Sequence, residues 1–243
     1  MNEFAQAYLV PDGTDLQGIK DAFEGRYSVT EDEPHELIRR FYDTFDWSLY
    51  QAGTVLEELS DSSQRELIWR DLHGEAPKLA WNTDRNPGFA ADLPQIPEID
   101  RLASLVGIRR LLPLLDVHTR LISWRLLNED GKTVARLEVE QNRYVDKGRE
   151  RQGPVSVLLR LHGVKGYDDE LQATARLLQE GLNLSLARAE LLQEALAAAG
   201  RRPLDYSSQL DFRLDPQRRA DATAKEILLH LLNTIEVNIP GTR

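Results

Sequence analysis

Alternating hydrophobic and polar residues dominate the first two thirds of the chain and predict β-strands. The alternation is clear over residues 4–9 and stops at the turn sequence Pro11-Asp12-Gly13. The sequence Asn-Glu-Asp-Gly at 128–131 is a strong hairpin turn signal. Strands of this number and spacing indicate a closed barrel or a sandwich. The other predicted strands cover residues 38–42, 54–59, 66–72, 78–81, 116–128, 132–143 and 155–161.

The spacing of hydrophobic residues becomes helical after Gly166. Helices are predicted over 168–180 and 185–199, and a short one follows Thr14 near the N-terminus. A third C-terminal helix begins at Asp215-Pro216, an N-cap followed by proline at the first helical position. Five hydrophobic residues lie on adjoining stripes of this last helix: Ile227, Leu228, Leu231, Leu232 and Ile235.

Composition and charge limit the classes of function. The formal net charge of −10 argues against broad nucleic-acid binding, because such binding needs a positive surface. The 243 residues include no cysteine, which excludes disulfides and thiolate metal sites. No hydrophobic run has the length of a membrane span, and the N-terminus lacks an export signal. The sequence therefore predicts a cytoplasmic protein with no nucleic-acid or membrane partner.

Residues 40–53 read RFYDTFDWSLYQAG, the most specific local string in the chain. This string resembles the Y-[FY]-D-T-x-D-x-x-L-x-x-x-G signature of CYTH domains, the family of bacterial adenylyl cyclases, thiamine triphosphatases and inorganic triphosphatases. The resemblance covers roughly residues 1–205. It implies an α+β fold, namely an antiparallel eight-stranded triphosphate-tunnel-like β-barrel with C-terminal helices. We interpret Asp43 and Thr44 as a turn and barrel-closure device in preference to catalytic groups.

The chain departs from the family pattern at charged positions. The first-strand motif E-x-E-x-K aligns with Glu3, Ala5 and Ala7, and a later basic pair aligns with Glu57 and Leu59. The closing strand, 155–163, has no acidic residue, although the family pattern has alternating glutamates there. Metal-assisted phosphoryl chemistry needs carboxylate ligands for the cation and positive groups for the phosphates. The departures therefore imply an interior no longer built for a metal-bound triphosphate.

Some charged residues on the predicted strands remain candidates. The resemblance implies phosphate binding most directly for Arg120, which follows Thr119 in a family-like T-R pair. Each candidate arginine can equally be an ordinary solvent-facing strand residue. The further phosphate-binding candidates are Arg125, Arg136 and Arg160.

No catalytic residue, metal ligand or cofactor is assigned. We expect a degenerate CYTH-like domain that binds triphosphate or polyphosphate weakly or not at all and is not an efficient enzyme. The alternative is a divergent inorganic triphosphatase that uses Mg²⁺ or Mn²⁺ with Glu3, Glu138 and Glu140. The five histidines have no zinc-site spacing.

The C-terminal segment carries a second resemblance. Residues 206–243 resemble the linker and first helix of a CHAD domain, a helical module associated with polyphosphate binding. This implies two domains, 1–205 and a truncated 206–243, with a CHAD-like domain as the partner in the full chain. The alternative is an ordinary C-terminal helix that packs on the barrel.

Overall fold

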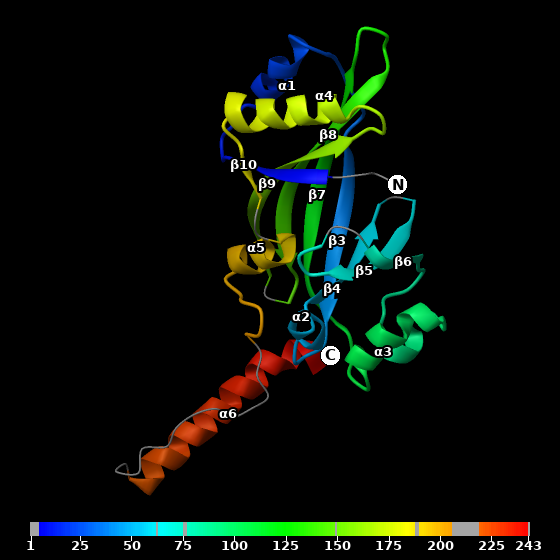
Figure 1. The fold of residues 1–243 in the computed structure, drawn as a ribbon. Helices are drawn as coiled ribbons and strands as arrows, with labels where there is room; N and C mark the ends of the chain where they lie inside the picture. Colours follow the sequence, from blue (N-terminus) through cyan, green and yellow to red (C-terminus); the bar gives the residue numbers. More distant parts are fainter. Residues whose placement is uncertain are drawn as a thin grey trace.

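Ten strands form one antiparallel sheet in the computed structural model of the chain (Figure 1). The structure describes residues 5–61, 63–74, 77–148, 150–187, 190–205 and 219–242, and the side chains of these residues except 5, 230 and 233–242. The strands are β1 (Ala5–Val10), β2 (Ser28–Glu31), β3 (His35–Asp43), β4 (Thr54–Ser60), β5 (Arg65–Asp71), β6 (Pro77–Asn82), β7 (Leu112–Leu127), β8 (Thr133–Asp146), β9 (Arg151–Gly163) and β10 (Ser185–Leu186).

The order of the strands confirms the predicted antiparallel α+β class. The strand order is β10-β1-β9-β8-β7-β3-β4-β5-β6, and β2 pairs with β7 beside this path. The sheet has ten strands where eight were expected, and the path of described pairings ends at β10 and β6 without closing into a ring. The two additional strands, β2 and β10, are four and two residues long. Strands this short leave too little alternation to be recognised in a sequence.

One predicted helix begins later than its hydrophobic spacing indicates. Residues 185–186 were expected to start the second C-terminal helix, but they form β10 and pair with Tyr8 and Leu9 of β1. The helix itself, α5, spans Leu191–Ala198. The expectation was wrong here because the edge of β1 offers unpaired backbone groups, and pairing with them outweighs a local helical preference.

The remaining helices lie close to their predicted positions or are short. α1 (Leu16–Glu24) begins after Asp15, whose side chain accepts the N–H of Gln17, so the cap is one residue later than the predicted Thr14. α4 (Asp168–Arg176) continues into a π-helical turn, η3 (Leu177–Gly181). The sequence pattern did not reveal four short elements: α2 (Ser48–Gln51), the 3₁₀ turns η1 (Ala90–Asp92) and η2 (Pro97–Ile99), and α3 (Asp100–Val106).

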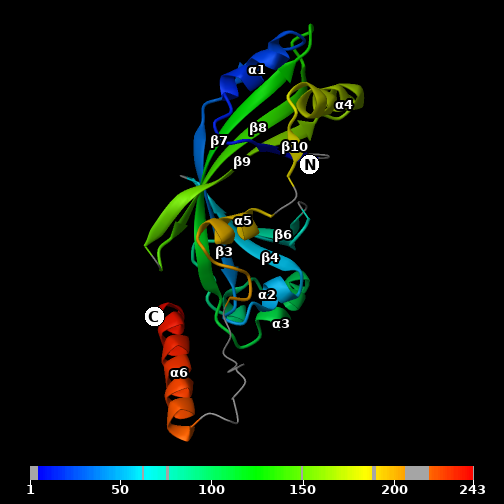
Figure 2. The ribbon, with the colours of Figure 1, turned by 90° about the vertical axis from the view of Figure 1, so that its left-hand side faces the viewer.

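Three hydrophobic clusters hold the helices on the sheet. α1 and α4 pack on one face of β1, β7, β8 and β9, where Phe23 belongs to the same cluster as the strand residues Leu137 and Leu161. α5 packs elsewhere, with Leu192 and Leu196 in one cluster with Phe41 and Val117. α3 lies with β4 and β5 in a third cluster. Figure 2 shows α1 and α4 at one end of the sheet and α3 at the other.

The last helix, α6, spans Ala220–Thr242, and most of it lies apart from the sheet in both views (Figures 1 and 2). The predicted start at Asp215-Pro216 lies outside the described residues, as does the side chain of Ile235. Leu228 and Leu232 are 59% and 55% exposed, while Ile227 and Leu231 are half-buried. The described part of the chain contains no helix that is both long and hydrophobic enough to cross a membrane.

Candidate functional site

The aspartate of the family-like motif is a structural anchor. Asp43 ends β3 and is buried, and its Oδ1 accepts the N–H of Thr44 at 2.7 Å and of Leu49 at 2.9 Å. Its Oδ2 accepts the N–H of Tyr50 at 2.9 Å. Burial raises the pKa of Asp43 to about 6, although these three backbone donors act to lower it. The hydrogen bonds confirm that Asp43 is a turn device, because they tie β3 to the start of α2.

A row of charged side chains crosses one face of the sheet between β5 and β9. Strand register brings these residues together: Glu138 is opposite Arg160, and Phe41, two residues after Arg39, is opposite Glu57. Because side chains alternate between faces, residues at these paired positions share one side of the sheet. We call this side the charged face, and its members are Arg39, Glu57, Arg70, Glu138, Glu140, Arg160 and His162.

Glu140 lies between two arginines of the charged face. Its Oε1 is 2.9 Å from Arg39 Nη2 and 2.9 Å from Arg160 Nε, and the residue is 2% exposed. Burial by itself would raise the pKa of Glu140, but the two guanidinium groups hold it below its ordinary value. The carboxylate is therefore ionised and already committed to cations from the protein.

Glu57 occupies a similar position between Arg39 and Arg70. Its Oε1 is 3.8 Å from Arg39 Nη1, and its Oε2 is 3.6 Å from Arg70 Nη2. Arg70 Nη1 also contacts Glu190 Oε2, from the residue before α5, at 3.0 Å. Three carboxylates thus neutralise three guanidinium groups. The arginines are Arg39, Arg70 and Arg160, and the glutamates are Glu57, Glu140 and Glu190.

A hollow of about 380 Å³ lies beside the charged face, near the hairpin turn that joins β7 to β8. Arg125 and Arg136 line it from paired positions, together with Glu138. Arg125 Nη2 is 2.8 Å from Asp32 Oδ1 of the neighbouring segment, and Arg136 is exposed. A hydrogen bond with His162 at 3.0 Å holds the pKa of Glu138 below its usual range.

The structure brings most, though not all, of the predicted site residues together. Five of them lie on one side of β7, β8 and β9, where Arg125 is opposite Arg136 and Glu138 is opposite Arg160. The five are Arg125, Arg136, Arg160, Glu138 and Glu140. Arg120 is not among them. It lies between Thr119 and Leu121, one residue out of phase with Arg125, and is exposed on the opposite side of β7. Glu3 lies outside the described residues.

Sequence reasoning missed two arginines and one glutamate of the network. Arg39 and Arg70 lie within predicted strands, and Glu190 lies within a predicted helix. A partial signal was available for Arg39, since it is two residues before Phe41 and must share the face of that residue. No local signal showed that this face would meet β8.

The described residues do not fit a metal-bound triphosphate. Mg²⁺ requires carboxylate oxygens that are available to it, whereas Glu138 and Glu140 are bound by His162, Arg39 and Arg160. Ala7, which replaces a charged residue of the family motif, lies opposite Arg160. Among the described residues, no group of three or more His, Cys, Asp or Glu is placed to hold a metal ion.

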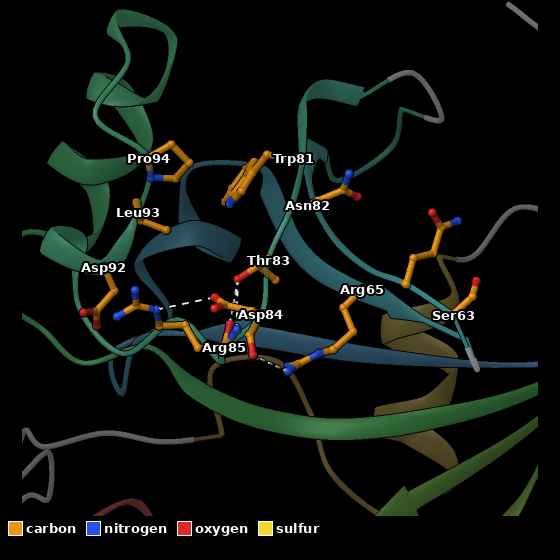
Figure 3. A pocket seen from close by; sticks show the side chains of 11 residues that line it. Ser63, Arg65, Trp81, Asn82, Thr83, Asp84, Arg85, Asp92, Leu93 and Pro94 are labelled. Atoms are coloured by element: carbon orange, nitrogen blue, oxygen red, sulfur yellow. Dashed lines mark hydrogen bonds and ion pairs between the residues drawn. The ribbon is translucent and has the colours of Figure 1, made fainter.

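A second hollow, of about 590 Å³, lies beside the end of β6 (Figure 3). Trp81, Leu93 and Pro94 are its hydrophobic side chains. Its charged groups already have partners within the chain. Arg65 Nη2 is 2.8 Å from Glu58 Oε2, and Asp92 Oδ2 accepts the N–H of Phe89 at 2.7 Å. We therefore assign no chemistry to this hollow.

No protein-family model and no curated protein sequence matches the chain. Solved structures do. A putative adenylyl cyclase from Hippeastrum, reported to have a dominant triphosphatase activity, is similar with a TM-score of 0.52 and 12% identity, over 84% of this chain and 99% of that chain. A putative adenylate cyclase from Bacillus halodurans has a TM-score of 0.49 and 14% identity, over 78% of this chain and 94% of that one. A putative adenylate cyclase from Vibrio parahaemolyticus has a TM-score of 0.43 and 13% identity, over 79% of this chain and 96% of that chain.

These similarities concern the fold alone, because the identities are low. Of the three structures, the Hippeastrum protein has a TM-score above 0.5 and shares the fold of this chain. The match confirms the predicted fold class, an antiparallel α+β fold of the triphosphate-tunnel type.

Proposed function

We propose that this chain, a triphosphate-tunnel fold, is a degenerate CYTH-like domain. It acts as a phosphate- or polyphosphate-associated binding or docking module and is not an efficient triphosphatase. The observation that carries the proposal is the pairing of Arg39, Arg70 and Arg160 with carboxylates of the same chain. A phosphate group would have to displace these carboxylates, and each displaced carboxylate would then be buried without its partner. The absence of cysteine supports a reducing, cytoplasmic setting for this role.

Wild-type protein is expected to release little phosphate from tripolyphosphate in the presence of Mg²⁺ or Mn²⁺. The reason is that Glu138 and Glu140, the best remaining carboxylates, are held by histidine and arginine. Malachite-green detection of phosphate over a pH series measures this directly. Substantial metal-dependent release that Glu138→Gln and Glu140→Gln abolish would establish the divergent triphosphatase instead. Glu36→Gln, an exposed change on β3, serves as the control.

Residual anion binding is proposed at the hollow lined by Arg125 and Arg136. Arg136 is exposed, and the Asp32 partner of Arg125 is itself 46% exposed, so an incoming anion can compete for both cations. The chemistry suits a phosphate oxygen, which arginine binds with paired N–H donors.

Arg136→Gln is expected to weaken tripolyphosphate binding about three- to tenfold, the loss expected for one charge-assisted contact at a partly exposed site. Isothermal titration at low ionic strength measures the change. Arg120→Gln removes the same charge from the opposite side of β7 and is the matched control. If Arg120→Gln weakens binding more than Arg136→Gln, the phosphate site lies on the Arg120 side, as the family resemblance implied.

The docking part of the proposal concerns α6. We propose that residues 206–243 are the linker and first helix of a CHAD-like domain and that the sheet positions that domain. Supporting this, Leu228, Leu229 and Leu232 are 59%, 67% and 55% exposed on α6. Large hydrophobic side chains that adjoin in this way usually mark a surface that another element covers.

A further inference from the structure

The ion pairs that neutralise the charged face are of two kinds. Glu140 makes hydrogen bonds to Arg39 and Arg160 at 2.9 Å. Glu57, in contrast, lies 3.6–3.8 Å from the nearest nitrogens of Arg70 and Arg39, beyond ordinary hydrogen-bond distance. Glu57 therefore supplies charge to the two arginines without using their N–H donors well.

Unused hydrogen-bonding atoms accompany this loose arrangement. Among the described residues of the charged face, four buried atoms have no hydrogen-bond partner: Arg39 Nε, Glu57 Oε2, Glu140 Oε2 and His162 Nδ1. Buried polar atoms are normally paired, because leaving one without a partner costs free energy. Arg39 thus retains an unused donor beside Glu57, whereas Arg70 Nη1 is already bound by Glu190 and by the backbone carbonyl oxygens of Asp71, Leu72 and Gly74. The Glu57 carboxylate neutralises both arginines without a close hydrogen bond to either one.

We infer that Glu57 is the residue that excludes polyphosphate anions from the charged face, because it acts as a built-in counter-ion for Arg39 and Arg70. The inference rests on the proposed function and assigns the exclusion of anions mainly to Glu57, with Glu190 as the second carboxylate on Arg70. A phosphate group carries the same sign of charge as the carboxylate and has more acceptor oxygens. With a neutral side chain at position 57, a phosphate group would bind the two guanidinium groups through more hydrogen bonds than the carboxylate makes.

The adjacent residue provides a matched control. Glu58 is buried to the same degree as Glu57, at 3% and 4% exposure, and is also paired with an arginine. Its partners are Arg65, at 2.8 Å, and the hydroxyl of Tyr42, at 2.9 Å, on the opposite side of β4. Glu57→Gln and Glu58→Gln therefore change net charge and burial equally, and only Glu57→Gln releases arginines of the charged face.

The test is titration of the full chain with tripolyphosphate, without metal and at low ionic strength, after circular dichroism has shown that each variant is folded. Glu57→Gln is expected to bind at least about tenfold more tightly than wild type, whereas Glu58→Gln stays within about twofold. An equal gain in both variants, or no gain in folded Glu57→Gln, overturns the inference.

A second variant keeps the test decisive if Glu57→Gln does not fold. Glu190→Gln removes the other carboxylate partner of Arg70 from a side chain that is 21% exposed, so it disturbs the core less. It is expected to bind about threefold more tightly than wild type, and the absence of any gain counts against the inference. Hydrolysis of tripolyphosphate by wild type would overturn the proposed function instead, so the two failures are distinguishable.

Discussion

Asp43→Ala is expected to lower the free energy of unfolding by about 3 kcal/mol or more, because it leaves three backbone N–H groups without an acceptor. Those donors belong to Thr44, Leu49 and Tyr50; the first two hydrogen bonds are buried and the third is partly buried. The aspartate stays ionised at pH 7, since its pKa is raised only to about 6. Urea unfolding at pH 7, followed by circular dichroism, measures the loss.

Asp61→Ala is the control for this substitution. Asp61 also accepts backbone hydrogen bonds, from Ser63 at 2.7 Å and Gln64 at 2.9 Å, but in an exposed turn where water can replace them. Asp61→Ala should therefore lower the free energy of unfolding much less than Asp43→Ala does. Equal destabilisation by the two substitutions would show that burial of the Asp43 turn contributes nothing.

Glu140→Gln is the second large change, expected to cost about 3 kcal/mol of folding stability at pH 7. The neutral amide leaves Arg39 and Arg160 without the anion that they share at 2.9 Å. Breaking a buried ion pair from one side is costly because the remaining charges stay buried.

The cost should depend on pH with a defined sign. The pKa of Glu140 is lowered in the folded protein, so its ionisation stabilises the fold above the ordinary glutamate pKa of 4.5, and this contribution is lost as the pH falls through the lower folded value. The gap between wild type and Glu140→Gln should therefore narrow as the pH falls below 4.5.

Urea midpoints of both proteins between pH 3 and pH 7 test this, and the comparison cancels the opposite contribution of Asp43, whose pKa is raised. Exposed Glu36→Gln should show little change at any pH in this range. A gap between wild type and Glu140→Gln that does not vary with pH would mean that packing, and not charge, holds Glu140 in place.

The two predictions separate the roles of the motif and the charged face. The motif around Asp43 builds a turn that the fold needs, and Gly53, which ends it, has φ of 68°, a conformation that favours glycine. The charged face takes no part in the hydrogen bonds of that turn, so the stability tests of Asp43 and Glu140 report on separate parts of the fold.

Local features of the sequence determined much of the fold. The hairpin of β7 and β8 follows from alternation on both sides of a turn at residues 128–131, where Gly131 has φ of 73°. The main strands and the stripe of α1 with buried Ile19 and Phe23 were also predictable. Such signals depend only on neighbouring residues, because alternation has a period of two and a helical stripe a period of 3.6.

The tertiary structure decided the register between strands, and with it the site. Arg39 meets Glu140 across 101 residues of sequence, and Arg70 meets Glu190 across 120. A shift of one residue in the register of β3 or β8 would turn Arg39 or Glu140 to the opposite face, as the position of Arg120 illustrates. The sequence alone could therefore identify the charged residues of each strand. It could not determine which of them neutralise one another, because strand register is fixed by packing across the whole sheet.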